Sequence, residues 1–94
     1  MSIVSIRSRR LVSRFEAAEL RHAIERALIA HGRAIVNARF LETLTPEAAD
    51  ECFGVLAKHH GVEYVSENVL LPDIPNHHLI TIAEAMQARA KEAS

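Results

Sequence analysis

The stretch from Thr45 to Leu71 constrains the fold most, because it combines a helix start, a helix stop and two short apolar runs. Thr45 suits the N-cap of a helix, and Pro46 suits the first helical position, where its missing N–H costs no hydrogen bond. Gly61 suits the helix end, since glycine enters the left-handed conformation without steric cost. The sequence therefore predicts a helix over residues 46–60.

Two apolar runs follow this helix, at residues 62–65 and 69–72, and the polar stretch 66–68 separates them. Valine and tyrosine are enriched in strands. Asn68 tolerates the positive φ that a tight turn requires. We therefore expect an antiparallel β-hairpin over residues 62–71.

Two more helices are predicted from caps and apolar spacing. Ser13 and Glu16 have the spacing of a capping box, and apolar residues recur every three to four positions until Gly32, which predicts a helix over 14–31. A last helix is predicted over 77–92. Its apolar stripe consists of Leu79, Ile82, Ala83, Met86 and Ala90.

Two segments fit more than one structure. Residues 33–44 alternate like a strand from Ala34 to Phe40, but they also contain apolar residues at helical spacing, and we expect a helix with the strand as the alternative. Residues 2–7 can form a short edge strand against the hairpin, and residues 1–12 can instead be a flexible arm.

The 94 residues predict a single small domain, mostly α with a small β-hairpin (α+β), with three to four helices. Aromatic residues are few, so each one is expected to anchor the core. These residues are Phe15, Phe40, Phe53 and Tyr64.

Charge is divided unevenly along the chain. Residues 1–39 contain eight Arg and three Glu, whereas residues 40–94 contain nine acidic and three basic residues. Arg binds carboxylates in a two-pronged geometry. One interpretation is an arginine surface for an acidic partner, and the other is that the two halves pair with each other, within or between chains. The candidate partner-binding residues are Arg7, Arg9, Arg10, Arg14 and Arg21.

We find no catalytic or cofactor signature, because the three glycines are isolated and no serine stands in a nucleophile elbow. Cys52 lies beside the apolar stripe of the 46–60 helix and is expected in the core. As the single cysteine it forms no internal disulfide, which favours a reducing, cytoplasmic compartment. No apolar run reaches the ~20 residues of a membrane span.

Six histidines raise the alternative of a metal site. Either of His59 and His60 could meet His77 or His78, with Glu63 or Asp73 adding a carboxylate. No recognised ligand spacing supports this site. We therefore expect no bound metal.

A nucleic-acid-binding alternative rests on the central stretch. Residues 56–62 resemble the turn of a helix-turn-helix, and a helix over 46–60 followed by a hairpin resembles a winged-helix domain. Acidic residues oppose this alternative, because carboxylates repel phosphates. They stand at the start of the candidate recognition helix, as Glu47, Asp50 and Glu51.

Residues 44–49 and 56–65 also resemble the N-terminal domains of secretion and pilus ATPases, which share a helix start, an apolar helix, a glycine and an apolar pair. Arg33 stands where some of those domains have a nucleotide-contacting arginine. Ile35 and Glu42 occupy the places of the glycines that accompany it there. The resemblance therefore implies no function for this chain.

The sequence favours a non-enzymatic binding or regulatory domain, an adaptor or inhibitor that acts by protein–protein contact. The expected partner is a protein with an acidic surface, and a homodimer is also expected because the aromatic core is thin. A winged-helix-like DNA-binding regulator is the alternative, and a histidine-based metal-binding protein is a lesser one. No cofactor and no membrane partner is expected.

Overall fold

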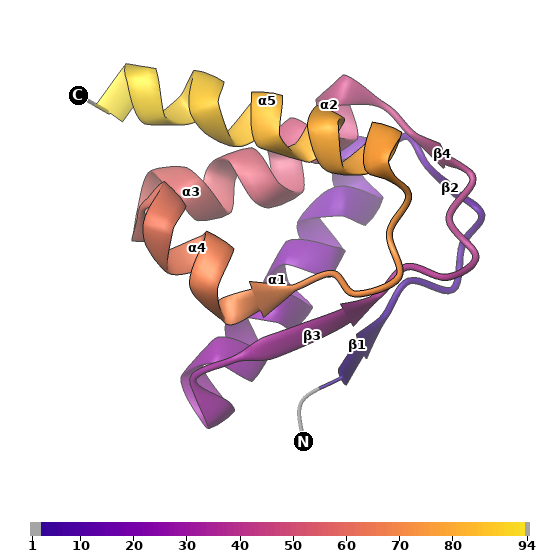
Figure 1. Ribbon diagram of the computed structural model, residues 1–94, viewed down its shortest axis with the longest axis horizontal. Coiled ribbons are helices and arrows are strands. Elements are labelled where there is room, and N and C mark those ends of the chain that lie inside the picture. Colours follow the sequence, from indigo (N-terminus) through magenta and orange to yellow (C-terminus); the bar gives the residue numbers. More distant parts are fainter. Residues whose placement is uncertain (1–2, 94) are drawn as a thin grey trace.

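A strand–helix–strand unit opens the chain and sets the topology of the molecule (Figure 1). The computed structural model describes residues 3–93. In chain order the elements are β1 (Ile3–Ser5), β2 (Arg10–Leu11), α1 (Arg14–His31), β3 (Ala34–Asn37), β4 (Thr43–Leu44), α2 (Pro46–Ala49), η1 (Asp50–Gly54), α3 (Val55–His60), α4 (Val62–Asn68), β5 (Val69–Leu70) and α5 (Asn76–Ala93).

The strands form two small sheets, and all of their pairings are parallel. The larger sheet has the order β1-β3-β5, with Val4 opposite Val36 and Ala34 opposite Val69. The second sheet has two strands, β2 and β4. Parallel neighbours need long crossover connections, which helices supply here. The molecule is therefore a compact α/β domain and not the α+β arrangement expected from the sequence.

Helix α1 confirms the predicted helix over 14–31. The Ser13 hydroxyl accepts a hydrogen bond from the backbone N–H of Glu16, and Gly32 ends the helix with φ 75°. Its buried side is apolar and consists of Ala17, Leu20, Ile24 and Leu28.

The predicted helix over 46–60 is confirmed as one continuous run of α2, η1 and α3. Thr45 caps it by accepting the N–H of Ala48, and Pro46 occupies the first turn. Its middle, Asp50–Gly54, is a π-helical turn. This central helix contacts both α1 and α5, and its buried Phe53 lies in the core that the three helices share.

The predicted hairpin over 62–71 is wrong. Gly61 has φ 93° and ψ 146°, so the backbone leaves the helical conformation and changes direction there. A new helix, α4, begins at Val62. Val62 and Val65 lie on one face of α4, and burying Val65 there outweighs the strand preference of valine. The short strand β5 then joins β3 in parallel.

The predicted helix over 33–44 is also wrong, and the strand alternative is correct for its first half. Ala34, Val36 and Ala38 are buried on one side of β3 and its continuation, while Ile35 and Asn37 are only partly buried. β1 is an edge strand as one alternative proposed, but its neighbour is β3 rather than a hairpin. Residues 1 and 2 of the expected arm lie outside the described residues.

Only one of the four expected aromatic anchors is in the core. Phe53 is 2% exposed, whereas Phe15, Phe40 and Tyr64 are 74%, 60% and 37% exposed. Small and aliphatic residues fill the interior instead. The winged-helix alternative is wrong as well, because a parallel strand and a helix replace its wing.

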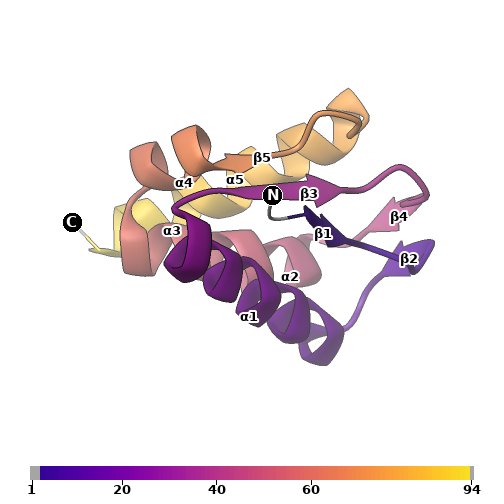
Figure 2. The ribbon, with the colours of Figure 1, turned by 90° about the horizontal axis from the view of Figure 1, so that it is seen from below.

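Helix α5 confirms the predicted last helix and begins at Asn76. It runs alongside the central helix and contacts it along its length, and α1 lies on the other side of that helix (Figures 1 and 2). Among residues 3–93, none of the helices combines the length and the apolar character that crossing a membrane requires.

Candidate functional site

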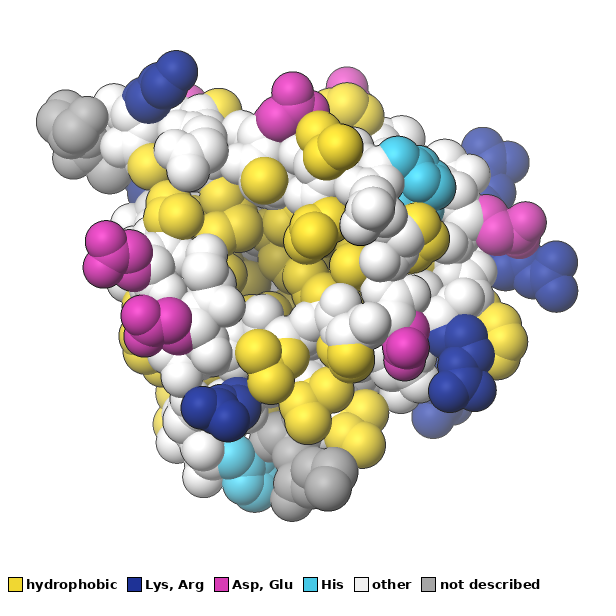
Figure 3. Space-filling view, in the orientation of Figure 1, with side chains coloured by type: hydrophobic (Ala, Val, Ile, Leu, Met, Phe, Trp, Pro, Cys, Tyr) yellow, Lys and Arg dark blue, Asp and Glu magenta, His cyan; other side chains and the backbone are white. Residues whose placement is uncertain are grey.

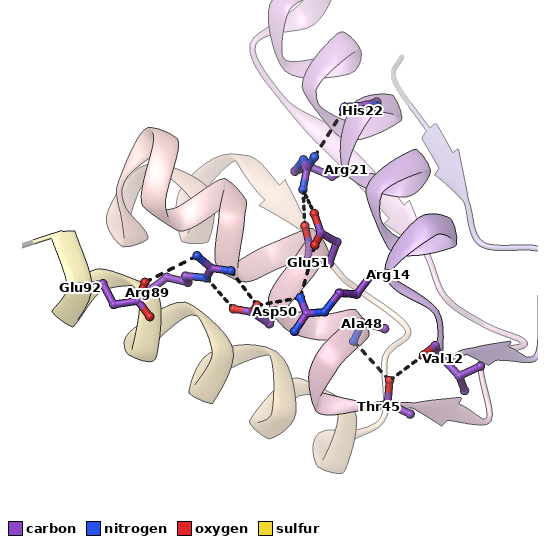
Figure 4. A network of polar contacts seen from close by, with 10 residues as sticks. All are labelled: Val12, Arg14, Arg21, His22, Thr45, Ala48, Asp50, Glu51, Arg89 and Glu92. Atoms are coloured by element: carbon purple, nitrogen blue, oxygen red, sulfur yellow. Dashed lines mark hydrogen bonds and ion pairs between the residues drawn. The ribbon is translucent and has the colours of Figure 1, made fainter.

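An ion-pair network joins the central helix to α1 and α5 (Figure 4). Asp50 and Glu51 are consecutive, and consecutive helical residues point about 100° apart, so they reach different neighbours. Asp50 accepts hydrogen bonds from Arg89 on α5, with Nε–Oδ1 at 2.7 Å and Nη2–Oδ2 at 2.8 Å. Glu51 accepts one from Arg21 on α1, with Nη1–Oε2 at 2.7 Å.

Arg14 connects the two halves of this network. Its Nη1 lies 3.1 Å from Asp50 Oδ2 and 3.3 Å from Glu51 Oε1. The hydrogen bonds from Arg89, and then from Arg14, lower the pKa of Asp50 from 3.8 to about 2. The hydrogen bond from Arg21 lowers the pKa of Glu51 in the same way. Both carboxylates therefore stay ionised at neutral pH and hold three helices together.

The five candidate partner-binding arginines fall into two groups. Arg14 and Arg21 belong to the ion-pair network, and the Arg21 side chain is only 13% exposed. Arg7, Arg9 and Arg10 are exposed on and beside β2, and Arg9 lies 3.6 Å from Glu42. The interpretation that the two halves pair within one chain thus describes Arg9, Arg14 and Arg21. Arg7 and Arg10 have no ion pair among the described residues.

The four histidines of the candidate metal site lie in two separate places. His60 Nε2 lies 3.5 Å from Glu25 Oε2, and the His60 ring stacks on Tyr64. His77 and His78 contact each other at the start of α5. Within residues 3–93, no group of three or more His, Cys, Asp or Glu side chains is placed to hold a metal ion.

Cys52 lies fully inside the core, as expected from the sequence. Its exposed fraction is 0%, and burial raises the pKa of its thiol. Since the thiolate is the reactive form of cysteine, this side chain is held in its unreactive form.

An apolar groove lies between α4, β5 and α5, with a volume of about 330 Å³. Ten of its twelve lining residues are apolar, and only Ser66 and Gln87 are polar. Figure 3 shows it as a hollow in which hydrophobic side chains are visible below α5 and beside α4. Leu79, at its border, is 45% exposed, and the neighbouring Ile80 is 59% exposed.

Acidic side chains lie beside this groove on α4, on α5 and on the loop that joins β5 to α5. Glu63 and Glu67 are exposed on α4, Asp73 follows the lining residue Leu71, and Glu84 follows the lining residue Ala83. In Figure 3, acidic side chains stand beside the hollow on the α4 side and above it on the α5 side. The groove therefore combines an apolar floor with a negative border.

The apolar stripe predicted for the last helix is a sequence signal for this groove. The five-residue apolar stripe of the last helix is divided by the structure. Ile82 and Met86 are buried, while Leu79 and Ala83 remain exposed. The buried side of α5 is instead completed by His78, Ala85 and Arg89. A stripe that continues past the core-facing side indicates a second apolar surface.

Comparison of the chain with protein-family models, with curated proteins and with solved structures found no match. The resemblance to the N-terminal domains of secretion and pilus ATPases thus has no support beyond the quoted residues, and no family is assigned to this chain.

Proposed function

We propose that this chain is a non-enzymatic protein-contact domain, an adaptor or inhibitor, that holds a partner protein in the groove between α4 and α5. The groove is the observation that carries this proposal. It is open and mostly apolar, and Leu79 and Ile80 extend its apolar surface to the outside. Contiguous exposed apolar surface with a polar border is typical of protein interaction sites.

The exposed arginines form a second proposed contact, for an acidic part of the partner. Of the five candidates, Arg7, Arg9 and Arg10 suit this role because their side chains reach solvent. Arg14 and Arg21 would first have to leave Asp50 and Glu51. Charges at the edge of an interface act mainly on the rate of association.

The proposal is tested by affinity capture from nuclease-treated lysate of the source cell, with the parent, Leu79→Gln and Ile29→Gln as baits. Ile29 is the matched control, because it is 87% exposed and lies on α1, away from the groove. We expect a protein that the parent and Ile29→Gln retain and that Leu79→Gln loses. Identical captured proteins on all three baits would contradict the proposal.

A further inference from the structure

We infer that the groove binds an amphipathic helix of a different protein, with Lys or Arg beside its apolar stripe. This inference rests on the proposed function and names the chemistry of the partner. It is drawn from the shape of the groove, from the charges around it and from the position of α1.

The shape of the groove fits one helix. On α5, the lining residues Leu79, Ile82, Ala83 and Met86 recur at the spacing of a single helical face. Leu79 and Met86 are seven residues apart, so this wall extends over about 10 Å. Val62, Val65 and Ser66 of α4 line the groove as well. A groove bordered by two helices accepts the apolar face of a third, which places anchors at positions i, i+3 or i+4, and i+7.

The charges around the groove favour a cationic partner. Residues 62–93 contain five acidic and two basic residues. One of the two basic residues, Arg89, is bound to Asp50. The exposed acids Glu63, Glu67 and Glu84 would attract Lys or Arg and repel a fatty acid, an anionic lipid or a nucleic acid. An apolar segment flanked by basic residues would contact the apolar floor of the groove and pair with its acidic border at the same time.

A second copy of this chain fits the groove less well. The large exposed apolar residues on α1 are Phe15 and Ile29, which are 14 residues and therefore about 21 Å apart, twice the length of the α5 wall. Figures 1 and 2 place α1 on the opposite side of the molecule from α4 and β5. A contact between α1 and the groove of another copy would be head-to-tail and would not close into a two-fold dimer.

The experiment uses three fluorescent peptides of about 14 residues, four helical turns. The first has Leu at one helical face and Lys elsewhere, the second has the same composition in scrambled order, and the third has Glu in place of every Lys. Each is titrated with the full chain at about 0.15 M salt, and fluorescence anisotropy reports binding. We expect saturable binding of the first peptide only.

Three variants locate the binding. Leu79→Gln removes an apolar anchor of the groove and should weaken the first peptide about tenfold. The double variant Glu63→Gln/Glu67→Gln should also bind the first peptide more weakly. The difference in affinity between this variant and the parent should become smaller as the salt concentration rises. Ile29→Gln should bind like the parent. Equal affinity of Leu79→Gln and parent, or equal binding of the Glu peptide, would overturn the inference.

Two further results separate this inference from the proposed function. If no peptide binds but Leu79→Gln still loses a captured protein, the helix inference falls and the protein-contact function stands. If no peptide binds and the captured proteins are also unchanged, both fall. If the parent is a dimer and Leu79→Gln is a monomer, the groove holds a second copy and the inference is overturned.

Discussion

Asp50 binds the central helix to both of its neighbours, α1 and α5. It accepts hydrogen bonds from Arg89 and Arg14 at the same time, and its side chain is 24% exposed. Gly54 lies one turn further along, where the central helix approaches α5 closely. Neither role is visible in the sequence, because an Asp and a Gly in a helix carry no sign of which side chains they meet.

Replacing Asp50 with Asn should remove part of the acid sensitivity of the fold. The folded-state pKa of Asp50 is lowered to about 2, below its ordinary 3.8, so the stabilisation is complete above the higher value and is lost as pH falls toward the lower one. This shift corresponds to at most about 2 kcal/mol. Urea unfolding at pH 7, 4 and 2.5 should show the parent losing more stability on acidification than Asp50→Asn, and parallel curves would contradict this.

Replacing Gly54 with Ala should destabilise the protein. A Cβ at this position would lie 2.7 Å from Asp50 Oδ1, 3.0 Å from Arg89 Cγ and 3.2 Å from the Ala85 carbonyl oxygen. Helix propensity alone predicts that this change would stabilise the protein, since Ala is favoured over Gly in a helix by about 1 kcal/mol. We expect a net loss of about 1–3 kcal/mol in urea unfolding at pH 7. A variant as stable as the parent would show that α5 can move away.

Among the elements, α4 shows how packing overrides local preference. Its valines favour strands, yet the helix forms and buries Val65 against the core. The Asn68 side chain donates to the Tyr64 carbonyl oxygen, so a residue that suggested a turn ends a helix instead.

A proline at Glu67 distinguishes the helix from the hairpin. Glu67 is exposed and lies inside α4, where proline removes a backbone hydrogen bond and clashes with the preceding turn, which costs about 3 kcal/mol. In a hairpin turn the same change would be tolerated. Thermal unfolding should show Glu67→Pro strongly destabilised and Glu67→Ala close to the parent. Similar stability of both variants would argue against α4.

Elements with caps were predictable, and elements decided by distant contacts were not. Ser13, Gly32, Thr45 and Pro46 act on neighbouring residues, so the helices they bound could be placed from the sequence. β3 and β5 exist because each finds a parallel neighbour far along the chain, and no local pattern specifies that pairing. The groove was missed for the same reason, since only the packing of α5 decides which side of its apolar stripe remains open.

Over the whole molecule, ion pairs within the chain neutralise part of the opposite charges of the two halves. Arg9, Arg14 and Arg21 pair with acids of the second half. Negative charge remains around the groove, and positive charge remains at Arg7 and Arg10 on another part of the surface. The molecule thus presents two separate charged surfaces, and the acidic one borders the apolar groove.

Self-association stays a prediction at this scale. Phe15, Ile29 and Phe40 are large apolar side chains that are more than half exposed, and burying them between two copies would be favourable. Light scattering over a wide concentration range should give twice the monomer mass of 10.4 kDa, and Leu79→Gln should keep that mass. A monomer mass at every concentration would refute the prediction.

The most direct measurement of the central claim is a map of backbone amide chemical shifts while the Leu/Lys peptide is titrated into the ¹⁵N-labelled chain. If the groove is the contact surface, the shifts should concentrate in α4, β5 and the stretch of α5 from Leu79 to Gln87, with little change on α1. Shifts centred on Arg7–Arg10, or spread evenly over the acidic surface, would contradict it.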